Sequence, residues 1–350
     1  MKVSVRDVAK KAGVSPMTVS RVINKADGVR PATRRHVEAT IAEMGYLASR
    51  SSKGARVQRT GTIGLIIPDV ANPFFALVLR AAEMAARREN YRLLVCNTEG
   101  DAALERDYIE DLMAHQVEGL ILAPVSDRSQ TALIPLMQQN YPLVLLDRLV
   151  DGIECDLVQG DSYGGARKLI HHLIGVGHRR IAIILGAGDV STTRERYAGY
   201  IAALQEAGLP VDRDLIAETT VDRLGGYRAM QQLMLLNERP SAVFAVNNMT
   251  AMGGMQALRE QGLSVPDDIA LVCFDDVEHL AILAPFMTVA DQPAETFGAM
   301  AAQMVIERIA GRAGDKPRIV RLPASLIVRT SCGVGRFPRV DEAASRKGQQ

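Results

Sequence analysis

The sequence predicts an all-α unit of about 60 residues, followed by an α/β core of two doubly wound, parallel-sheet subdomains. From Gly61 onward, short β-branched runs alternate with longer amphipathic runs, which is the pattern of parallel strands joined by helices. The first 60 residues contain three helical segments and few strand formers. The alternating region covers about 260 residues, more than one hydrophobic core holds comfortably, so we expect two subdomains side by side.

Two series of strands make up the predicted core. The first covers 63–67, 92–95, 119–122 and 143–146, with helices over 74–89, 102–115 and 129–139. The second covers 181–185, 242–246 and 269–274, with helices that begin near Thr192, Gly225 and Thr250. Ligands of open α/β sheets bind beyond the carboxyl ends of the strands, so facing strand ends predict a cleft between the subdomains.

Charge is distributed unevenly along the chain. The net charge is only +1, yet residues 1–60 hold 13 Lys and Arg against 4 Asp and Glu, while the other 290 residues hold 28 against 36. A cationic unit joined to a mildly anionic one is typical of a small nucleic-acid-binding module fused to an ordinary soluble domain. A solvated basic helical face is the plainer interpretation, and charge alone does not exclude it.

Several classes of protein are disfavoured. The four cysteines are far apart and form no C-x-x-C pair, so we expect reduced thiols and neither a disulfide framework nor a zinc site. The adjacent His171 and His172 diverge by about 100° on a helix and do not form a chelating pair. The first residues lack a signal-peptide pattern and no run of eighteen apolar residues occurs, so we expect a cytoplasmic protein without a membrane span.

The first 24 residues predict two short helices joined by a tight turn. Residues 5–12 place Val5, Val8, Ala9 and Ala12 on one face, and Gly13 supplies the turn. Ser15 caps the second helix and Pro16 occupies its first position. Its inward residues are Val19, Val22 and Ile23, and its outward residues are Met17, Thr18, Ser20, Arg21 and Asn24. Such a pair favours a helix-turn-helix that enters the major groove, although an ordinary helical hairpin has the same pattern.

The segment V-R-D-V-A-x-x-A-G-V-S-P-x-T-V-S-R-V-I-N over residues 5–24 closely resembles the headpiece of the lactose-repressor/galactose-repressor family. Other matches are Asn72-Pro-Phe-Phe, Asp147-Arg148, Arg196-x-x-Gly199-Tyr and Phe274-Asp275-Asp276, and the resemblance extends over residues 3–330. It implies a helix-turn-helix headpiece over 1–48, a hinge over 49–60 and a periplasmic-binding-protein-like effector and dimerisation domain over 61–330. Residues 331–350 are expected to form a disordered tail.

The resemblance assigns DNA contacts to the headpiece. Ser15, Pro16, Met17 and Arg21 fall at its recognition helix, where Pro16, Met17 and Arg21 read base edges. Arg21 suits guanine through two hydrogen bonds. Pro16 and Met17 have no side-chain donor, so they read shape or apolar surface. The residues that fall where the family holds phosphates are Thr18, Ser20, Asn24, Thr33 and Arg34, which position the headpiece without reading sequence.

The hinge departs from the family pattern. The family inserts a leucine from a hinge helix between two central base pairs of the minor groove, but Ala55 occupies that position here. Alanine is too small to insert in the same way, and the neighbouring Gly54 lowers helix propensity by about 1 kcal/mol relative to alanine. We expect a weaker kink in the DNA and more reliance on phosphate contacts from Arg50, Lys53 and Arg56, so Ala55→Leu should tighten binding to an operator with a central CG step in a gel-shift titration.

The same resemblance implies a small-molecule effector in the cleft. Its predicted contacts are Asn72, Phe74, Asp147, Arg196, Val221, Asn247, Asn248 and Asp275. Phe74 would cover a ring face, while Arg196, Asn247 and Asp275 suit hydroxyls or a carboxylate; each of them also has a purely structural interpretation. Val221 stands where many members have a stacking aromatic residue, and Asn248 stands where an aspartate is usual, so the ligand need not be a hexose.

Two other functions have partial support in the sequence. Gly160-Asp-Ser162-Tyr-Gly164 fits G-x-S-x-G, but the triad order would require His279, which follows Asp276 by only three residues, and no oxyanion segment is present. A sugar-binding receptor without DNA activity would share the core, yet it would need export and would not need the headpiece. The favoured interpretation is a non-enzymatic, dimeric repressor of double-stranded operator DNA, controlled by a sugar, sugar acid or similar metabolite, with no cofactor or metal.

Overall fold

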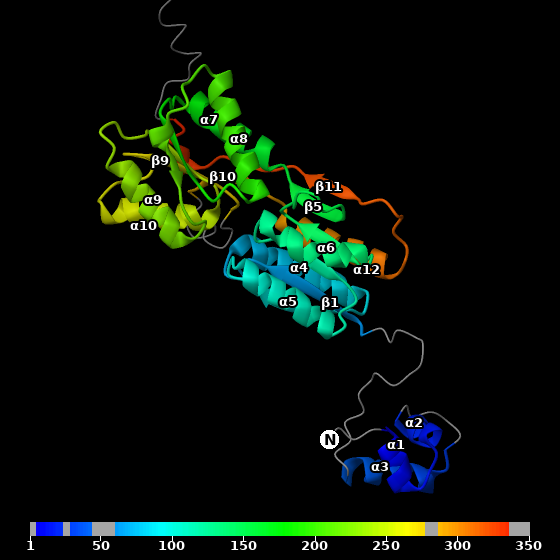
Figure 1. Ribbon diagram of the computed structural model, residues 1–350. Coiled ribbons are helices and arrows are strands. Elements are labelled where there is room, and N and C mark those ends of the chain that lie inside the picture. Colours follow the sequence, from blue (N-terminus) through cyan, green and yellow to red (C-terminus); the bar gives the residue numbers. More distant parts are fainter. Residues whose placement is uncertain (1–4, 24–28, 44–59, 277–285, 336–350) are drawn as a thin grey trace, which may run out of the picture. The chain divides into compact units, whose positions relative to one another are not determined.

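The computed structural model describes residues 5–23, 29–43, 60–276 and 286–335 (Figure 1). The chain divides into two compact units, Met1–Arg59 and Thr60–Gln350. Within the second unit, two α/β lobes are visible in Figure 1: lobe 1 carries α4, α5, α6 and α12, and lobe 2 carries α7 to α10. Each unit is held together by its own buried hydrophobic side chains.

The first unit is a three-helix cluster of α1 (Val5–Ala12), α2 (Pro16–Ile23) and α3 (Pro31–Glu43). Gly13 has φ +64°, the left-handed conformation that a tight turn between two helices requires. The Ser15 hydroxyl accepts a hydrogen bond from Thr18 N at 3.1 Å and so caps α2, as the sequence predicted. The small core is formed by Val8, Ala9, Ala12, Val19, Val22 and Val37.

Lobe 1 contains a six-stranded sheet in the order β11-β5-β4-β3-β1-β2, and all of its pairings are parallel. Its strands are β1 (Thr62–Ile67), β2 (Arg92–Asn97), β3 (Leu120–Leu122), β4 (Leu143–Leu146), β5 (Asp156–Gly160) and β11 (Ile319–Leu322). The helices are α4 (Pro73–Arg88), α5 (Ala102–Ala114), α6 (Gln130–Gln138) and α12 (Ala294–Ile309), with the 3-10 helix η1 (Asp127–Ser129). Separate apolar clusters lie on its two faces, so the central strands are buried on both sides.

Lobe 2 repeats this plan with the order β12-β10-β9-β8-β6-β7. Its strands are β6 (Ile181–Leu185), β7 (Ile216–Glu218), β8 (Ala242–Ala245), β9 (Ala270–Phe274), β10 (Thr288–Asp291) and β12 (Ser325–Ile327). The helices are α7 (Ser162–Val176), α8 (Ser191–Glu206), α9 (Arg223–Met234) and α10 (Asn248–Glu260), with the 3-10 helices η2 (Arg213–Leu215) and η3 (Thr330–Cys332). The sheet is doubly wound and parallel except at one edge, where β12 runs antiparallel to β10.

The chain passes between the lobes three times. It leaves lobe 1 after β5, returns after β10 to form α12 and β11, and crosses again before β12. The periodicity of the sequence did not predict this return. The core also extends past residue 330, where the predicted tail begins: Ser331 and Cys332 are buried, and the Ser331 hydroxyl accepts a hydrogen bond from Thr288 N at 2.8 Å. Residues 336–350 lie outside the described part.

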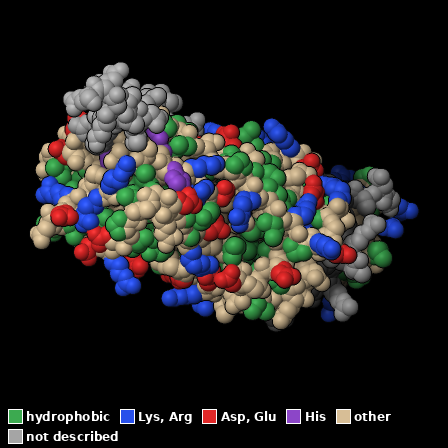
Figure 2. Space-filling view, turned by 90° about the horizontal axis from the view of Figure 1, so that it is seen from above, with side chains coloured by type: hydrophobic (Ala, Val, Ile, Leu, Met, Phe, Trp, Pro, Cys, Tyr) green, Lys and Arg blue, Asp and Glu red, His purple; other side chains and the backbone are tan. Residues whose placement is uncertain are grey.

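One face of the molecule carries charges of both signs. On the face shown in Figure 2, basic and acidic side chains are interspersed rather than gathered into patches of one sign. The excess of basic residues in the sequence is confined to residues 1–60, where 13 Lys and Arg stand against 4 Asp and Glu. The cationic character of the chain therefore belongs to the first unit.

A buried cluster of charged side chains holds α12 and the start of β11 against β5 in lobe 1. The Asp156 carboxylate is fully buried at the start of β5 and accepts hydrogen bonds from Arg308 Nη2 at 2.6 Å and Arg318 Nη2 at 2.7 Å. The backbone N–H of Arg318 donates a further bond at 2.8 Å. Burial favours the neutral acid, but the bonds from Arg308 and Arg318 outweigh it and lower the pKa of Asp156.

Replacing Asp156 with asparagine is expected to lower the free energy of unfolding by about 2–3 kcal/mol at pH 7, because two guanidinium groups lose their anion. The folded-state pKa lies below the unfolded one, so the carboxylate's contribution is full above about pH 4 and is lost as the pH falls through the folded-state value. Urea unfolding at neutral and acid pH measures this. The two chains should differ at pH 7 and converge in acid.

Asp212→Asn is the matched control, since it breaks an ion pair with Arg180 in which both side chains are 31% exposed. Exposed pairs contribute less than about 1 kcal/mol, so this variant should lose correspondingly little. Equal losses in the two variants, or a loss at Asp156 that persists in acid, would contradict the proposed role of the cluster.

Candidate functional site

The exposed face of α2 carries the predicted base-reading residues. Met17 is 67% exposed, and Pro16 and Arg21 are also exposed, while Val19 and Val22 of the same helix are buried. Thr18 is half-buried because its hydroxyl lies 2.9 Å from that of Ser15. The helix therefore presents an apolar side chain and a guanidinium on a rigid three-helix support, which suits insertion into a groove.

The predicted phosphate contacts are only partly within the described residues. Thr33 and Arg34 lie in the first turn of α3 and are half-buried. Asn24, Arg50, Lys53, Ala55 and Arg56 lie outside the described residues, as does the side chain of Ser20. Their roles therefore stay predictions.

A cleft separates the two lobes at the carboxyl ends of their strands. A cavity of about 1150 Å³ is lined by both lobes, and it continues inward to a narrow recess of about 30 Å³. Seven of the eight residues predicted to bind the effector line this recess: Asn72, Phe74, Asp147, Arg196, Val221, Asn247 and Asp275. The structure thus brings together side chains that are up to two hundred positions apart in the sequence.

Arg196 lies in the second turn of α8, at the centre of the recess, and only 6% of it is exposed. Its Nη1 donates to the carbonyl of Val246 at 2.6 Å and lies 3.7 Å from Asp275 Oδ2. Its Nε donates to the Ser162 hydroxyl at 3.3 Å, and its guanidinium stacks 3.8 Å from the centre of the Phe274 ring. This buried cation is held from several sides and is therefore pre-oriented for a ligand.

Two acids from opposite lobes flank Arg196. Asp147 follows β4 and Asp275 follows β9, and both have left-handed backbones, with φ of +65° and +64°. Such conformations are uncommon for residues other than glycine and cluster at functional sites. Burial raises the pKa of Asp275 to about 6, although Arg196 and the Gln292 amide act to lower it. Burial likewise raises the pKa of Asp147 against the effects of Arg148, Arg196 and Gln292.

Asparagine side chains shape the walls of the recess. Asn72 caps α4 by accepting a hydrogen bond from Phe74 N at 3.0 Å, and Asn247 caps α10 by accepting one from Thr250 N at 2.8 Å. Asn247 also donates to the carbonyl of Val221 at 3.0 Å. Asn248, the eighth predicted residue, donates to Asn72 Oδ1 at 3.2 Å and so connects lobe 2 to lobe 1.

Phe74 borders the recess and also packs in the core of lobe 1. It lines the recess, yet it is only 5% exposed, and its ring packs edge-on against Phe75 and Phe297 at 5.1 and 5.5 Å. Val221, in contrast, is 36% exposed on the facing wall. One wall is thus a fixed aromatic surface, and the other is a small aliphatic side chain.

Sequence reasoning missed four polar residues of this region. Arg148, Thr192 and Thr193 line the recess, and Gln292 donates to Asp275 Oδ1 at 2.8 Å. Arg148 follows a predicted site residue and the two threonines open a predicted helix, so proximity in sequence could have indicated them. Gln292 lies in the segment between β10 and α12, and no motif marks it.

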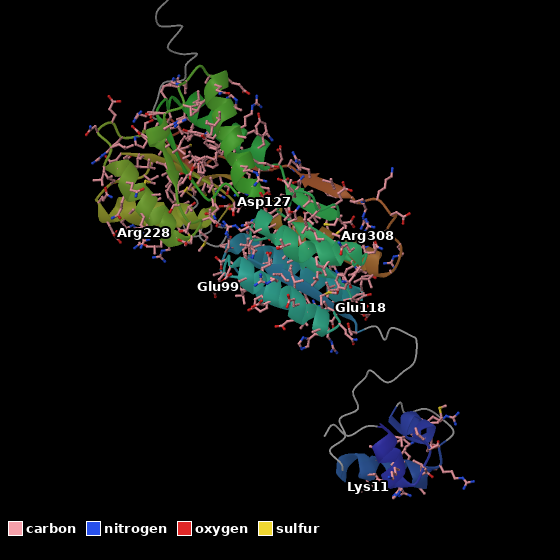
Figure 3. The ribbon with its side chains drawn as sticks, viewed as in Figure 1. Lys11, Glu99, Glu118, Asp127, Arg228 and Arg308 are labelled. Atoms are coloured by element: carbon pink, nitrogen blue, oxygen red, sulfur yellow. The ribbon has the colours of Figure 1, made fainter. Side chains whose placement is uncertain are left out.

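Ion pairs close one side of the cleft. Arg194 of α8 lies 2.6 Å from Asp127 of η1, and Arg128 lies 3.7 Å from Asp189 of lobe 2. The backbone N–H of Asp127 donates to the Asp189 carbonyl at 2.9 Å. Figure 3 labels Asp127 where the two lobes meet. The lobes are therefore in direct polar contact in this conformation.

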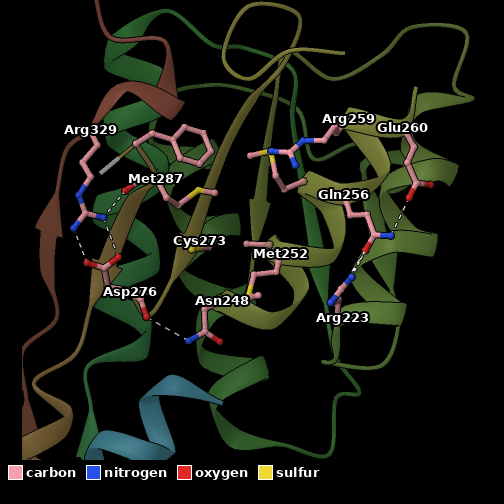
Figure 4. Close-up of a pocket in the computed structure, with 13 residues that line it drawn as sticks. Arg223, Asn248, Met252, Gln256, Arg259, Glu260, Cys273, Asp276, Met287 and Arg329 are labelled. Atoms are coloured by element: carbon pink, nitrogen blue, oxygen red, sulfur yellow. Dashed lines mark hydrogen bonds and ion pairs between the residues drawn. The ribbon is translucent and has the colours of Figure 1, made fainter. Parts of the chain in front are cut away.

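Lobe 2 holds a second cavity of about 520 Å³ (Figure 4). Its lining is mainly apolar and includes Met252, Met255 and Met287, with the Arg329–Asp276 ion pair at its rim. Asn248 is the only predicted effector residue in this lining. The cleft, where charged groups from both lobes converge, is therefore the stronger candidate for a ligand site.

The G-x-S-x-G segment forms a turn between a strand and a helix. Ser162 is the first residue of α7, is 1% exposed, and accepts a hydrogen bond from Arg196 rather than from a histidine. Among the described residues, no group of three or more His, Cys, Asp or Glu side chains could hold a metal ion. Nor is any helix in this part of the chain long and apolar enough to cross a bilayer.

The chain matches two described protein families. Residues 4–49 match the bacterial regulatory proteins of the lacI family, and residues 60–330 match the periplasmic binding proteins and sugar binding domain of the LacI family. The ribose operon repressor of Escherichia coli K12 is 36% identical over 306 residues, which are 87% of this chain and 93% of that protein.

Two solved structures are similar over nearly the whole length. The complex of the transcriptional regulator CelR with cellobiose has a TM-score of 0.71 and 30% identity, covering 94% of this chain and 99% of the other. The lac repressor dimer bound to operator and an anti-inducer has a TM-score of 0.70 and 26% identity, covering 95% and 99%. These matches confirm the predicted fold class.

Proposed function

The chain belongs to the LacI family of bacterial regulatory proteins, and from this we propose that a neutral, hydroxyl-rich metabolite in the cleft controls its binding to operator DNA. The chain is a DNA-binding transcriptional regulator that responds to a small-molecule effector and acts as a dimer, as the sequence predicted. We infer the chemical class of its effector from the geometry of the cleft.

The observation that carries the proposal is a pair of buried polar atoms in the recess without partners. Among the described residues that line it, Asp147 Oδ1, an acceptor, and Arg148 Nε, a donor, have no hydrogen-bond partner. Buried polar groups strongly favour a partner, and a ligand hydroxyl, which both donates and accepts, fits this pair. The acids Asp147 and Asp275 balance Arg148 and Arg196 in the recess, so it offers no excess of positive charge to a carboxylate or phosphate.

The walls of the cleft support a compact ligand. Val221 replaces a stacking ring with a small aliphatic side chain, while the Phe74 side offers one aromatic surface. A single ring with hydroxyls on its edges would contact Phe74 and reach the acids of both lobes. The relatives named for ribose and cellobiose fit this chemistry, and we favour a monosaccharide held in the wider cavity of about 1150 Å³ with one edge at the recess, because Phe74 offers a single aromatic surface.

We also propose DNA-contact roles for the residues of the headpiece. Met17, Pro16 and Arg21 read base edges from the exposed face of α2, and Thr33 and Arg34 hold phosphates from α3. The assignments of Thr18, Ser20, Asn24, Arg50, Lys53, Ala55 and Arg56 rest on the family pattern. The family is made up of regulators, and we propose that this chain catalyses no reaction and works in the cytoplasm, where its operator lies.

A ligand screen on the full-length protein tests the effector class. D-ribose, D-xylose and D-glucose represent neutral sugars, and D-gluconate and ribose 5-phosphate represent anions of similar size. At 100 times its Kd, a true ligand stabilises the folded state by about 2.7 kcal/mol and raises the melting temperature. We expect a neutral sugar to do so and the anions to have no effect. Stabilisation by the anions alone would overturn the proposed class.

A further inference from the structure

A short loop of lobe 1 makes direct contact with lobe 2. This bridging loop, residues 124–129, follows β3 and includes η1. The N–H of Asp127 donates to the Asp189 carbonyl at 2.9 Å, and the Asp127 carboxylate lies 2.6 Å from Arg194 Nη1 of α8. Arg128 Nε lies 3.7 Å from Asp189 Oδ2. The loop therefore holds the two lobes together through a backbone hydrogen bond and two ion pairs.

The bridging loop is fastened to the interior of lobe 1 by Glu105. This residue lies in the first turn of α5, is 1% exposed, and accepts a hydrogen bond at Oε2 from Val125 N at 2.8 Å. Arg148 Nη1 donates to the Pro124 carbonyl at 2.9 Å and forms a second attachment. Both attached residues come just before Asp127 in the chain. The position of Asp127 relative to lobe 2 therefore depends on how firmly Val125 and Pro124 are held.

A carboxylate is a costly side chain at the position of Glu105. It shares the buried face of α5 with Ile109 and Leu112, where an apolar side chain would avoid the removal of a charge from water. Burial raises the pKa of Glu105, although the bond from Val125 N acts to lower it. Glu105 is not among the described residues that line the recess or the wider cavity of the cleft. Its polar contact therefore serves the bridging loop and not a ligand.

We propose that Glu105 is a positioning residue for the bridging loop: its carboxylate holds Val125 so that Asp127 reaches lobe 2, and it thereby stabilises the arrangement in which the lobes touch. We call this arrangement closed. Loss of the Glu105 bond would loosen the loop, weaken its contacts with lobe 2 and shift the equilibrium toward open lobes. The proposal concerns the ligand-free protein and does not depend on the class of effector.

A contact outside the bridging loop reports whether the lobes open. The N–H of Leu149, in the segment after β4, donates to the Ser191 hydroxyl of lobe 2 at 3.1 Å. Neither residue belongs to the loop, so opening of the lobes should expose the Leu149 N–H together with that of Asp127. If Glu105 stabilised only its own loop, the Leu149 N–H would stay protected when Glu105 is replaced.

The test measures amide hydrogen exchange of the ligand-free full chain by mass spectrometry with fragmentation to single residues. Glu105→Met keeps the length of the side chain and removes the carboxylate. The Asp127 and Leu149 amides should then exchange about tenfold faster, the change expected for one lost hydrogen bond to a charged group. Arg194→Ala, which removes the partner of Asp127 in lobe 2, should speed both amides by about threefold.

The double variant shows whether Glu105 acts through the contact between the lobes. In the Arg194→Ala background, Glu105→Met should speed Leu149 exchange by at most about half the factor that it gives in the wild type, because the loop has already lost one contact with lobe 2. An undiminished factor would mean that the effect reaches Leu149 within lobe 1, through Arg148, and would overturn the proposal.

Two further variants complete the experiment. Glu110→Met on the exposed side of α5 is the matched control and should change neither amide. Glu105→Gln keeps an acceptor for Val125 N and should restore most of the slow exchange. If the Glu105→Met chain does not fold, Glu105→Ala takes its place with the same expectations. Faster exchange at Val125 and Asp127 with an unchanged Leu149 amide would show that Glu105 supports only its own loop, and would overturn the proposal.

Discussion

A chain that begins at Thr60 is expected to lose sequence-specific operator binding, with a fall in affinity of at least about 10³-fold at physiological salt. The reason is that the base-reading helix α2 and the concentrated positive charge both belong to residues 1–59. The second unit has its own hydrophobic cores, so the truncated chain should fold and keep its ligand-induced rise in melting temperature. Fluorescence anisotropy with an operator duplex and thermal unfolding measure the two properties separately.

A single substitution tests the role of α2 without removing the whole first unit. Arg21→Ala removes one exposed guanidinium of α2 and should weaken operator binding by about 1–3 kcal/mol while relaxing the preference at one base pair. Arg213→Ala removes the same charge from an exposed position in the second unit and should change neither property. If both variants weaken binding equally, or the truncated chain still selects its operator, the headpiece is not the reading element.

Replacing Arg196 with alanine is expected to reduce effector affinity by about 100-fold, which corresponds to the loss of two charge-assisted hydrogen bonds. The same change leaves Asp275 and Asp147 buried without their shared cation. Operator binding itself should persist, because α2 and α3 are unchanged. In the variant, the sugar is therefore expected to change operator affinity only at about 100-fold higher concentrations than in the wild type, as anisotropy titrations would record.

Two further variants test whether Arg196→Ala lowers effector affinity only because the chain no longer folds. Arg196→Lys keeps the charge but not the planar fork, and should recover stability more fully than ligand affinity. Arg194→Ala removes a neighbouring arginine of α8 that is 38% exposed and pairs with Asp127, and should weaken the ligand far less. An Arg196→Ala chain that melts normally and binds the sugar like the wild type would disprove the assignment.

The sequence predicted the local elements well because local patterns decide them. The Gly13 turn, the Ser15 cap and Pro16 limit α1 and α2, and both helices lie where those signals place them. Most strands of the core also lie at the predicted β-branched runs. What the periodicity did not reveal is which sheet a late strand joins. Pairing of β11 with β5 depends on the long-range contacts of Asp156, Arg308 and Arg318, which no local pattern encodes.

The candidate site also contains residues that the sequence predicted and residues that it did not. Seven of the predicted effector residues converge on one recess, since the family pattern already carried their spatial relationship. Gln292 could not be predicted, because its hydrogen bond to Asp275 joins two segments that meet only in the folded protein. Likewise, nothing in the sequence indicated that Asn248 would bond to Asn72 across the cleft. Groups defined by tertiary contact are the ones that sequence reasoning missed.

We expect that ligand in the cleft and operator DNA on α2 change each other's binding affinity for the protein. Such coupling is typically about 5–150-fold and must be reciprocal. The most direct test titrates the neutral sugar found in the screen into the full-length dimer, with and without a saturating operator duplex. We expect the duplex to change sugar affinity by the same factor by which the sugar changes operator affinity. Identical sugar affinity in both titrations, while the sugar still binds, would contradict the claim.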